Sequence, residues 1–163
     1  MVVPNYTENS LVNLMSSIIH HFHGQSPYNP LKKTLRLKRN VVLLVLDGLG
    51  NEYLHKYGQN SVFLKYYHQQ LNSIFPSTTA AAMTSFYTGL APNNHGIISC
   101  FTYLRELGVI SAILPFRIRG FNYPINTKTI EPEDILHFSS LLETLPALKT
   151  AIIPTDFMNA PYT

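Results

Sequence analysis

The chain has 163 residues and a mass of 18.4 kDa, which suits one domain and leaves little room for a second. Hydrophobic residues make up 45% of the sequence and charged residues only 13%, so the composition excludes a largely disordered chain. The formal net charge of +3 is too small to indicate nucleic-acid binding, and we expect none.

Because Cys100 is the single cysteine, the chain forms no internal disulfide and has no CxxC metal-binding motif, and a reducing compartment is favoured. The first residues, MVVPNYTENS, lack the features of a secretory signal. No apolar run approaches the roughly 18–20 residues that cross a bilayer. We therefore expect a soluble, cytoplasmic protein that makes no membrane contact.

The first 39 residues predict a helix followed by a basic connector. Apolar residues recur every three or four positions from Ser10 to Phe22, which indicates an amphipathic helix. Gly and Pro residues between 24 and 30 indicate a loop that ends it. Five basic residues lie within Leu31–Arg39, and they form either a solvated connector or a surface that contacts anions.

The remainder of the chain predicts strands alternating with helices. Val41–Leu46 is an uninterrupted aliphatic run, typical of a strand buried on both faces of a parallel sheet. Further strands are expected at Leu71–Phe75, Val109–Leu114 and Ala151–Ile153, with helices at Ser61–Gln70 and at Thr79–Tyr87, the latter closed by Gly89. This alternation predicts an α/β fold with a mostly parallel sheet flanked by helices.

Two polar features follow the predicted strands. Asp47 comes directly after Leu46, where it either binds a divalent cation or caps the turn at Gly48. Thr78 and Thr79 lie where an alanine-rich helix begins, which suits either a phosphoryl group at the helix terminus or a plain N-cap. If both features meet at one sheet edge, a metal ion held by Asp47 would activate the Thr79 hydroxyl.

Two segments, VVLLVLDGLG (41–50) and IFPSTTAAAMTSFYTGLAPNNHGI (74–97), resemble the type I phosphodiesterase and nucleotide pyrophosphatase branch of the alkaline phosphatase superfamily. The resemblance implies a metal-dependent hydrolase of phosphodiester or pyrophosphate bonds. It also implies that Asp47 and Thr79 bind one ion of a two-metal site, that the metal is zinc, and that Thr79 attacks phosphorus. The substrate would be a phosphate ester or a nucleotide.

The same resemblance implies an alkaline-phosphatase-like catalytic domain of which residues 1–163 form a single N-terminal portion. Residues 1–39 would be the helical lead-in and basic connector, and residues 40–163 the sheet core. An incomplete sheet would leave an exposed edge, through which we expect the chain to associate.

The sequence also departs from the family pattern. Cys100 stands where the family carries an asparagine, and the later Asp-His pair is missing. Asp134 and His137 are either replacement ligands or ordinary surface residues, whereas His95 is expected to fix a loop by hydrogen bonds. We therefore expect a chain that is inactive on its own. The alternative is a truncated, non-catalytic remnant that binds phosphate-bearing ligands or a partner.

Overall fold

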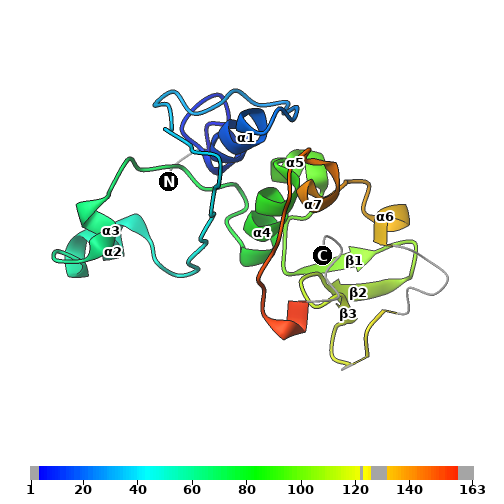
Figure 1. Ribbon diagram of the computed structural model, residues 1–163. Helices are drawn as coiled ribbons and strands as arrows, with labels where there is room; N and C mark the ends of the chain where they lie inside the picture. Colours follow the sequence, from blue (N-terminus) through cyan, green and yellow to red (C-terminus); the bar gives the residue numbers. More distant parts are fainter. Residues whose placement is uncertain (1–3, 122, 126–131, 158–163) are drawn as a thin grey trace.

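The computed structural model describes residues 4–121, 123–125 and 132–157, and it combines helices with one small sheet (Figure 1). The helices are α1 (Leu11–His21), α2 (Asn51–Tyr57), α3 (Val62–Lys65), α4 (Thr79–Thr88), α5 (Pro92–His95), α6 (Pro132–Ile135), α7 (Leu141–Thr144) and the 3₁₀ turn η1 (Thr155–Phe157). The strands are β1 (Phe101–Leu104), β2 (Val109–Ala112) and β3 (Arg117–Ile118). None of the helices in these ranges has the length and apolarity needed to cross a bilayer.

Helix α1 confirms the amphipathic helix predicted from the apolar spacing. Its buried face packs against α4, and it carries one fully buried amide, Asn13. The Asn13 Oδ1 atom accepts the Ser10 N–H at 3.0 Å, while Nδ2 donates to the carbonyls of Tyr6 (3.0 Å) and Asn29 (2.8 Å). This side chain therefore ties the first residues and the following loop to the helix.

Helix α4 lies at the centre of the molecule and confirms the predicted alanine-rich helix (Figure 1). It ends at Gly89, whose φ of 70° is the left-handed conformation that glycine adopts most easily. Ala80 and Ala81 are both fully buried, but they belong to different hydrophobic clusters. Small side chains on two faces thus let α4 pack against α1 and, on the other side, toward the sheet.

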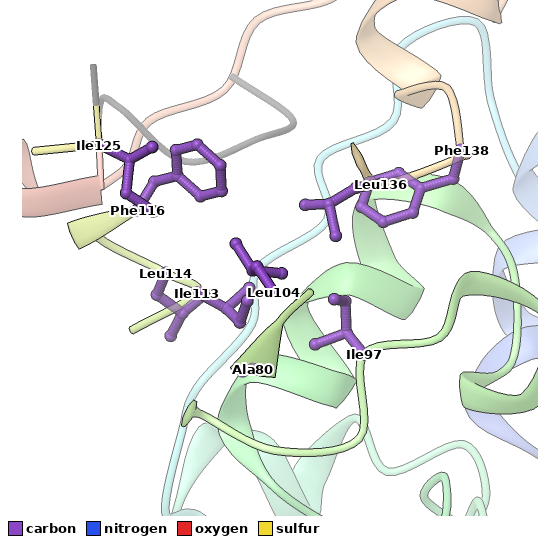
Figure 2. Packing of buried hydrophobic residues seen from close by; sticks show 9 residues of the cluster. All are labelled: Ala80, Ile97, Leu104, Ile113, Leu114, Phe116, Ile125, Leu136 and Phe138. Atoms are coloured by element: carbon purple, nitrogen blue, oxygen red, sulfur yellow. The ribbon is translucent and has the colours of Figure 1, made fainter. Parts of the chain in front are cut away.

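The cluster on the sheet side joins α4 to residues that follow it in the chain (Figure 2). Its buried members are Ala80, Ile97, Leu104, Ile113, Leu114, Phe116, Ile125, Leu136 and Phe138. Cys100 packs against this cluster as a partly buried residue.

The sheet is antiparallel, so the prediction of a mostly parallel sheet is wrong. The strand order is β1-β2-β3, with Tyr103 opposite Ile110 and Ala112 opposite Arg117. The predicted strand at Val109–Leu114 is present as β2, but it pairs with its sequence neighbours through short turns rather than through crossover helices. Gly108, with a φ of 65°, permits the turn between β1 and β2.

The aliphatic run Val41–Leu46 forms neither strand nor helix, which contradicts the prediction of a buried strand. A parallel strand requires neighbouring strands that bond its N–H and C=O groups and helices that cover its faces. Among the described residues no strand pairs with this segment, and side chains such as Val42 (91% exposed) and Leu44 (69%) face solvent.

Three other predicted elements are also absent or shorter than expected. Within the predicted helix Ser61–Gln70, only Val62–Lys65 is helical, and a separate helix, α2, precedes it. Leu71–Phe75 contributes one isolated parallel bridge, between Ser10 and Asn72, rather than a strand. Ala151–Ile153 has no regular structure.

Candidate functional site

Asp47 lies in a tight turn that follows the aliphatic segment. Gly48 has a φ of 76°, so the glycine provides the backbone conformation that the sequence predicts for this turn. The Asp47 side chain is exposed, and Gly50 is the N-cap of helix α2, which begins at Asn51. The turn thus presents a carboxylate to solvent rather than burying it.

The two threonines at the beginning of α4 have different environments. Thr78 is the N-cap, and its Oγ1 atom accepts the Ala81 N–H at 3.3 Å. Thr79 is the first helical residue, and its side chain is exposed. The hydroxyl of Thr78 therefore satisfies a backbone donor of the helix, whereas Thr79 lies on an exposed position of the first turn.

Thr79 Oγ1 donates a hydrogen bond to Asp47 Oδ2, with 3.4 Å between the oxygens. These residues are 32 positions apart in the sequence, so only the fold brings them together. The distance is long for a hydrogen bond between two oxygens, which usually spans about 2.5–3.0 Å. The pair is therefore close but loosely bonded, with both oxygens open to solvent.

The spacing of these two oxygens is compatible with a shared metal ion. Two oxygens that bind one zinc ion tetrahedrally at ~2.0–2.2 Å lie about 3.3–3.6 Å apart, and the observed separation is 3.4 Å. No cluster of three or more His, Cys, Asp or Glu side chains occurs among the described residues. The Asp47–Thr79 pair could thus supply two ligands, with the rest of the coordination shell coming from elsewhere.

The other candidate ligands do not join this pair. Asp134 and His137 are both exposed, but α6 ends at Ile135, so they do not share a helix face. The histidines near the end of α1 have separate partners: His20 Nδ1 is 3.2 Å from Ser16 Oγ, and His21 Nε2 is 2.9 Å from the Lys38 carbonyl oxygen.

His95, the last residue of α5, is buried and fixes the loop that follows, as the sequence predicts. Its Nδ1 atom accepts the Ile97 N–H at 3.1 Å, which leaves Nε2 as the protonated nitrogen, 3.1 Å from Ser85 Oγ. Burial lowers the pKa of His95 from 6.5 to about 4. The ring is therefore neutral and donates to Ser85, so it is not placed to remove a proton from that hydroxyl.

A separate hollow of about 690 Å³ lies between α2 and α3. Its lining includes His55, Ser61 and Lys65 but neither Asp47 nor Thr79. The hollow is shallow and open to solvent, so it is distinct from the carboxylate–hydroxyl pair.

Comparison with known proteins identifies one family. Residues 41–113 match the family model described as type I phosphodiesterase / nucleotide pyrophosphatase, and they include Asp47, Thr79 and His95. No curated protein and no solved structure gives a match. The match covers just under half of the chain and confirms the resemblance seen in the sequence. Over residues 41–113, the chain is thus similar to the type I phosphodiesterase / nucleotide pyrophosphatase family, a family of hydrolases.

Proposed function

We propose that the chain is part of an alkaline-phosphatase-like hydrolase that cleaves phosphodiester or pyrophosphate bonds of phosphate esters or nucleotides. Thr79 is the nucleophile, and Asp47 and Thr79 are ligands of a divalent ion, which we take to be zinc. One observation carries the proposal: Thr79 Oγ1 and Asp47 Oδ2 lie 3.4 Å apart although 32 positions separate them in the sequence. The family match over the same residues supports it.

The position of Thr79 at the beginning of α4 supports its role as the nucleophile. The unpaired N–H groups of the first helical turn, together with the helix dipole, favour an anionic phosphoryl group beside its hydroxyl. The Thr79 oxygen forms a bond to phosphorus as its hydroxyl proton passes to solvent water, and the bond to the leaving group breaks with its electron pair going to the leaving group. Water then attacks phosphorus and releases the threonine. A bound ion would lower the pKa of the hydroxyl and stabilise charge on the phosphoryl oxygens.

Thr78 serves a different purpose in this proposal. Because its Oγ1 atom is already bonded to the Ala81 N–H, it stabilises the helix that carries the nucleophile. This division of roles favours Thr79 over Thr78 as the attacking residue.

We propose further that the 163-residue chain is inactive by itself. In the family, later Asp-x-x-x-His and Asp-His motifs complete the two-metal site, and the sequence contains no Asp-His pair. A single carboxylate and a single hydroxyl do not hold two ions. The alternative is a non-catalytic chain that retains phosphate binding at the beginning of α4.

Calorimetry with zinc tests the metal site. We expect weak binding of one ion per chain, abolished in Asp47→Asn and at least ~10-fold weaker in Thr79→Ala. Ser77→Ala is the matched control, because it removes another exposed hydroxyl two residues away. Equal zinc binding by Asp47→Asn and the unaltered chain would refute the metal site.

An assay with bis(p-nitrophenyl) phosphate and zinc tests the inactivity separately. We expect no turnover above that of Thr79→Ala. Robust turnover that Thr79→Ala abolishes would establish the nucleophile and refute the inactivity. Phosphate binding without zinc, weakened by Thr79→Ala, would favour the non-catalytic alternative.

A further inference from the structure

In the aliphatic segment Val41–Leu46, apolar side chains are exposed to solvent and the backbone lacks hydrogen-bond partners within the described chain. Leu43, Val45 and Leu46 are 37–44% exposed, and Val42 and Leu44 are more exposed still. Its backbone N–H and C=O groups form no hydrogen bond with any residue that the structure describes. The segment thus consists of six aliphatic residues without proline, glycine or charge, of which all but Val41 are exposed, and its backbone groups are unpaired within the described chain.

Such a segment has a strong tendency to pair with another strand. Valine and leucine side chains fit a pleated surface, and β-branched residues favour extended backbone. An exposed, unpaired strand of six or seven apolar residues without proline is a template for pairing with another chain. Pairing would satisfy the backbone groups and remove the apolar side chains from water.

The charges at the two ends of the segment favour a second copy of the chain as the partner, and they favour antiparallel over parallel pairing. Arg39 precedes it and Asp47 follows it, and both side chains are exposed. Two copies paired antiparallel about Leu43 bring Arg39 of each copy opposite Asp47 of the other. All the positions between these charges are then apolar except Asn40. In a parallel, in-register pair the arginines would lie side by side, as would the aspartates, and like charges that face each other are destabilising.

We propose that Val41–Leu46 is a self-association site, at which two copies of this chain form an antiparallel two-stranded ribbon centred on Leu43. Arg39 pairs with Asp47 of the other copy at each end. The hydrogen bond from Thr79 uses Oδ2 of Asp47, so Oδ1 remains for the guanidinium group. This inference does not depend on the catalytic proposal, because it uses only the exposure of the segment and the charges at its ends.

Sedimentation equilibrium of the full 163-residue chain tests the association. We expect a monomer–dimer equilibrium, with dimerisation at least ~10-fold weaker in Leu43→Lys, because the two lysines would face each other at the centre of the ribbon. Ile152→Lys is the matched control, since Ile152 is an aliphatic residue that is 97% exposed and lies outside any helix or strand. Circular dichroism checks that both variants keep their helices.

The charge pairs are tested by reversal and by exchange. Arg39→Asp should weaken the dimer, and the double variant Arg39→Asp/Asp47→Arg should restore it, because the exchange recreates opposite charges at both ends. A double variant as weak as the single one would overturn the proposed pairing of Arg39 with Asp47.

Cysteine cross-linking tests the register, in a Cys100→Ala background that removes the native thiol. In the proposed ribbon, residue 43 of one chain lies opposite residue 43 of the other, with about 5 Å between their Cα atoms. Residue 41 lies opposite residue 45 of the other chain, so the two residues 41 are about 14 Å apart. A disulfide requires less than about 7 Å. Oxidation should therefore join Leu43→Cys chains but not Val41→Cys chains. Equal cross-linking of both variants, a monomer at all concentrations, or open-ended fibres would each overturn the proposal.

Discussion

The buried ring of His95 makes the stability of the protein depend on pH. In the folded chain the ring is neutral, because burial lowers the pKa of His95 from 6.5 to about 4. In the unfolded chain the ring takes up a proton as the pH falls below 6.5. Between pH 6.5 and about 4 the unfolded state therefore binds more protons than the folded state, and the free energy of unfolding decreases as the pH falls.

The size of this effect follows from the two pKa values of His95. Above pH 7 the residue contributes no pH dependence, and at pH 4.5 it lowers the free energy of unfolding by up to about 2.5 kcal/mol. The cost arises because burial disfavours the charged form of the ring. The loss would be a large fraction of the stability of a small domain.

Urea unfolding at pH 7.5 and pH 4.5 measures the effect, with His95→Gln as the test variant. We expect His95→Gln to be less stable than the unaltered chain at pH 7.5 but to lose about 2 kcal/mol less between the two pH values. An unchanged pH dependence in His95→Gln would refute the assignment of the effect to this ring.

Three further predictions concern stability, each measured by urea unfolding at pH 7.5. Asn13→Ala should cost about 3 kcal/mol, because it leaves the N–H of the buried Ser10 and the carbonyls of Tyr6 and Asn29 without their partner. Gly89→Ala should cost about 1–2 kcal/mol, because φ is 70° and the new Cβ would lie 2.6 Å from Ile19 Cδ1. Its cost should be smaller in an Ile19→Val background, which lacks that methyl group. Ser111→Ala should stabilise the chain by ~1 kcal/mol, because the Ser111 hydroxyl is fully buried without a hydrogen-bond partner in the described residues. Additive costs for Gly89→Ala and Ile19→Val, or a destabilised Ser111→Ala, would contradict these explanations.

The elements that the sequence predicted correctly depend on local signals. Helix α1 follows from apolar spacing over one continuous segment, and α4 follows from an alanine run closed by Gly89. The turn at Gly48 follows from the ability of glycine to adopt positive φ. In each case the residues that carry the signal are the ones that form the structure.

The sheet was not predictable in the same way, because strands depend on their partners. An aliphatic run such as Val41–Leu46 indicates a preference for burial, but a strand forms only where another strand pairs with it. The run has no partner strand in the described chain, whereas Phe101–Leu104, which the sequence did not mark as a strand, pairs with β2 across the turn at Gly108.

The candidate site was predictable as far as its two residues. The family resemblance singled out Asp47 and Thr79, and the structure places them side by side. The sequence offered an N-cap at Thr78 or Thr79 without deciding between them, and it did not predict the bond between Ser85 and His95, because both depend on the orientation of side chains within a formed helix.

The central position of α4 affects the order in which parts of the protein unfold locally. Since α4 contributes residues to both hydrophobic clusters, disruption of either cluster exposes a buried face of α4 to solvent. Helices α2 and α3, in contrast, have no buried side chains and contact each other. Amide protons in α1 and α4 should therefore exchange with solvent together and slowly, while those of residues 51–67 exchange early and independently.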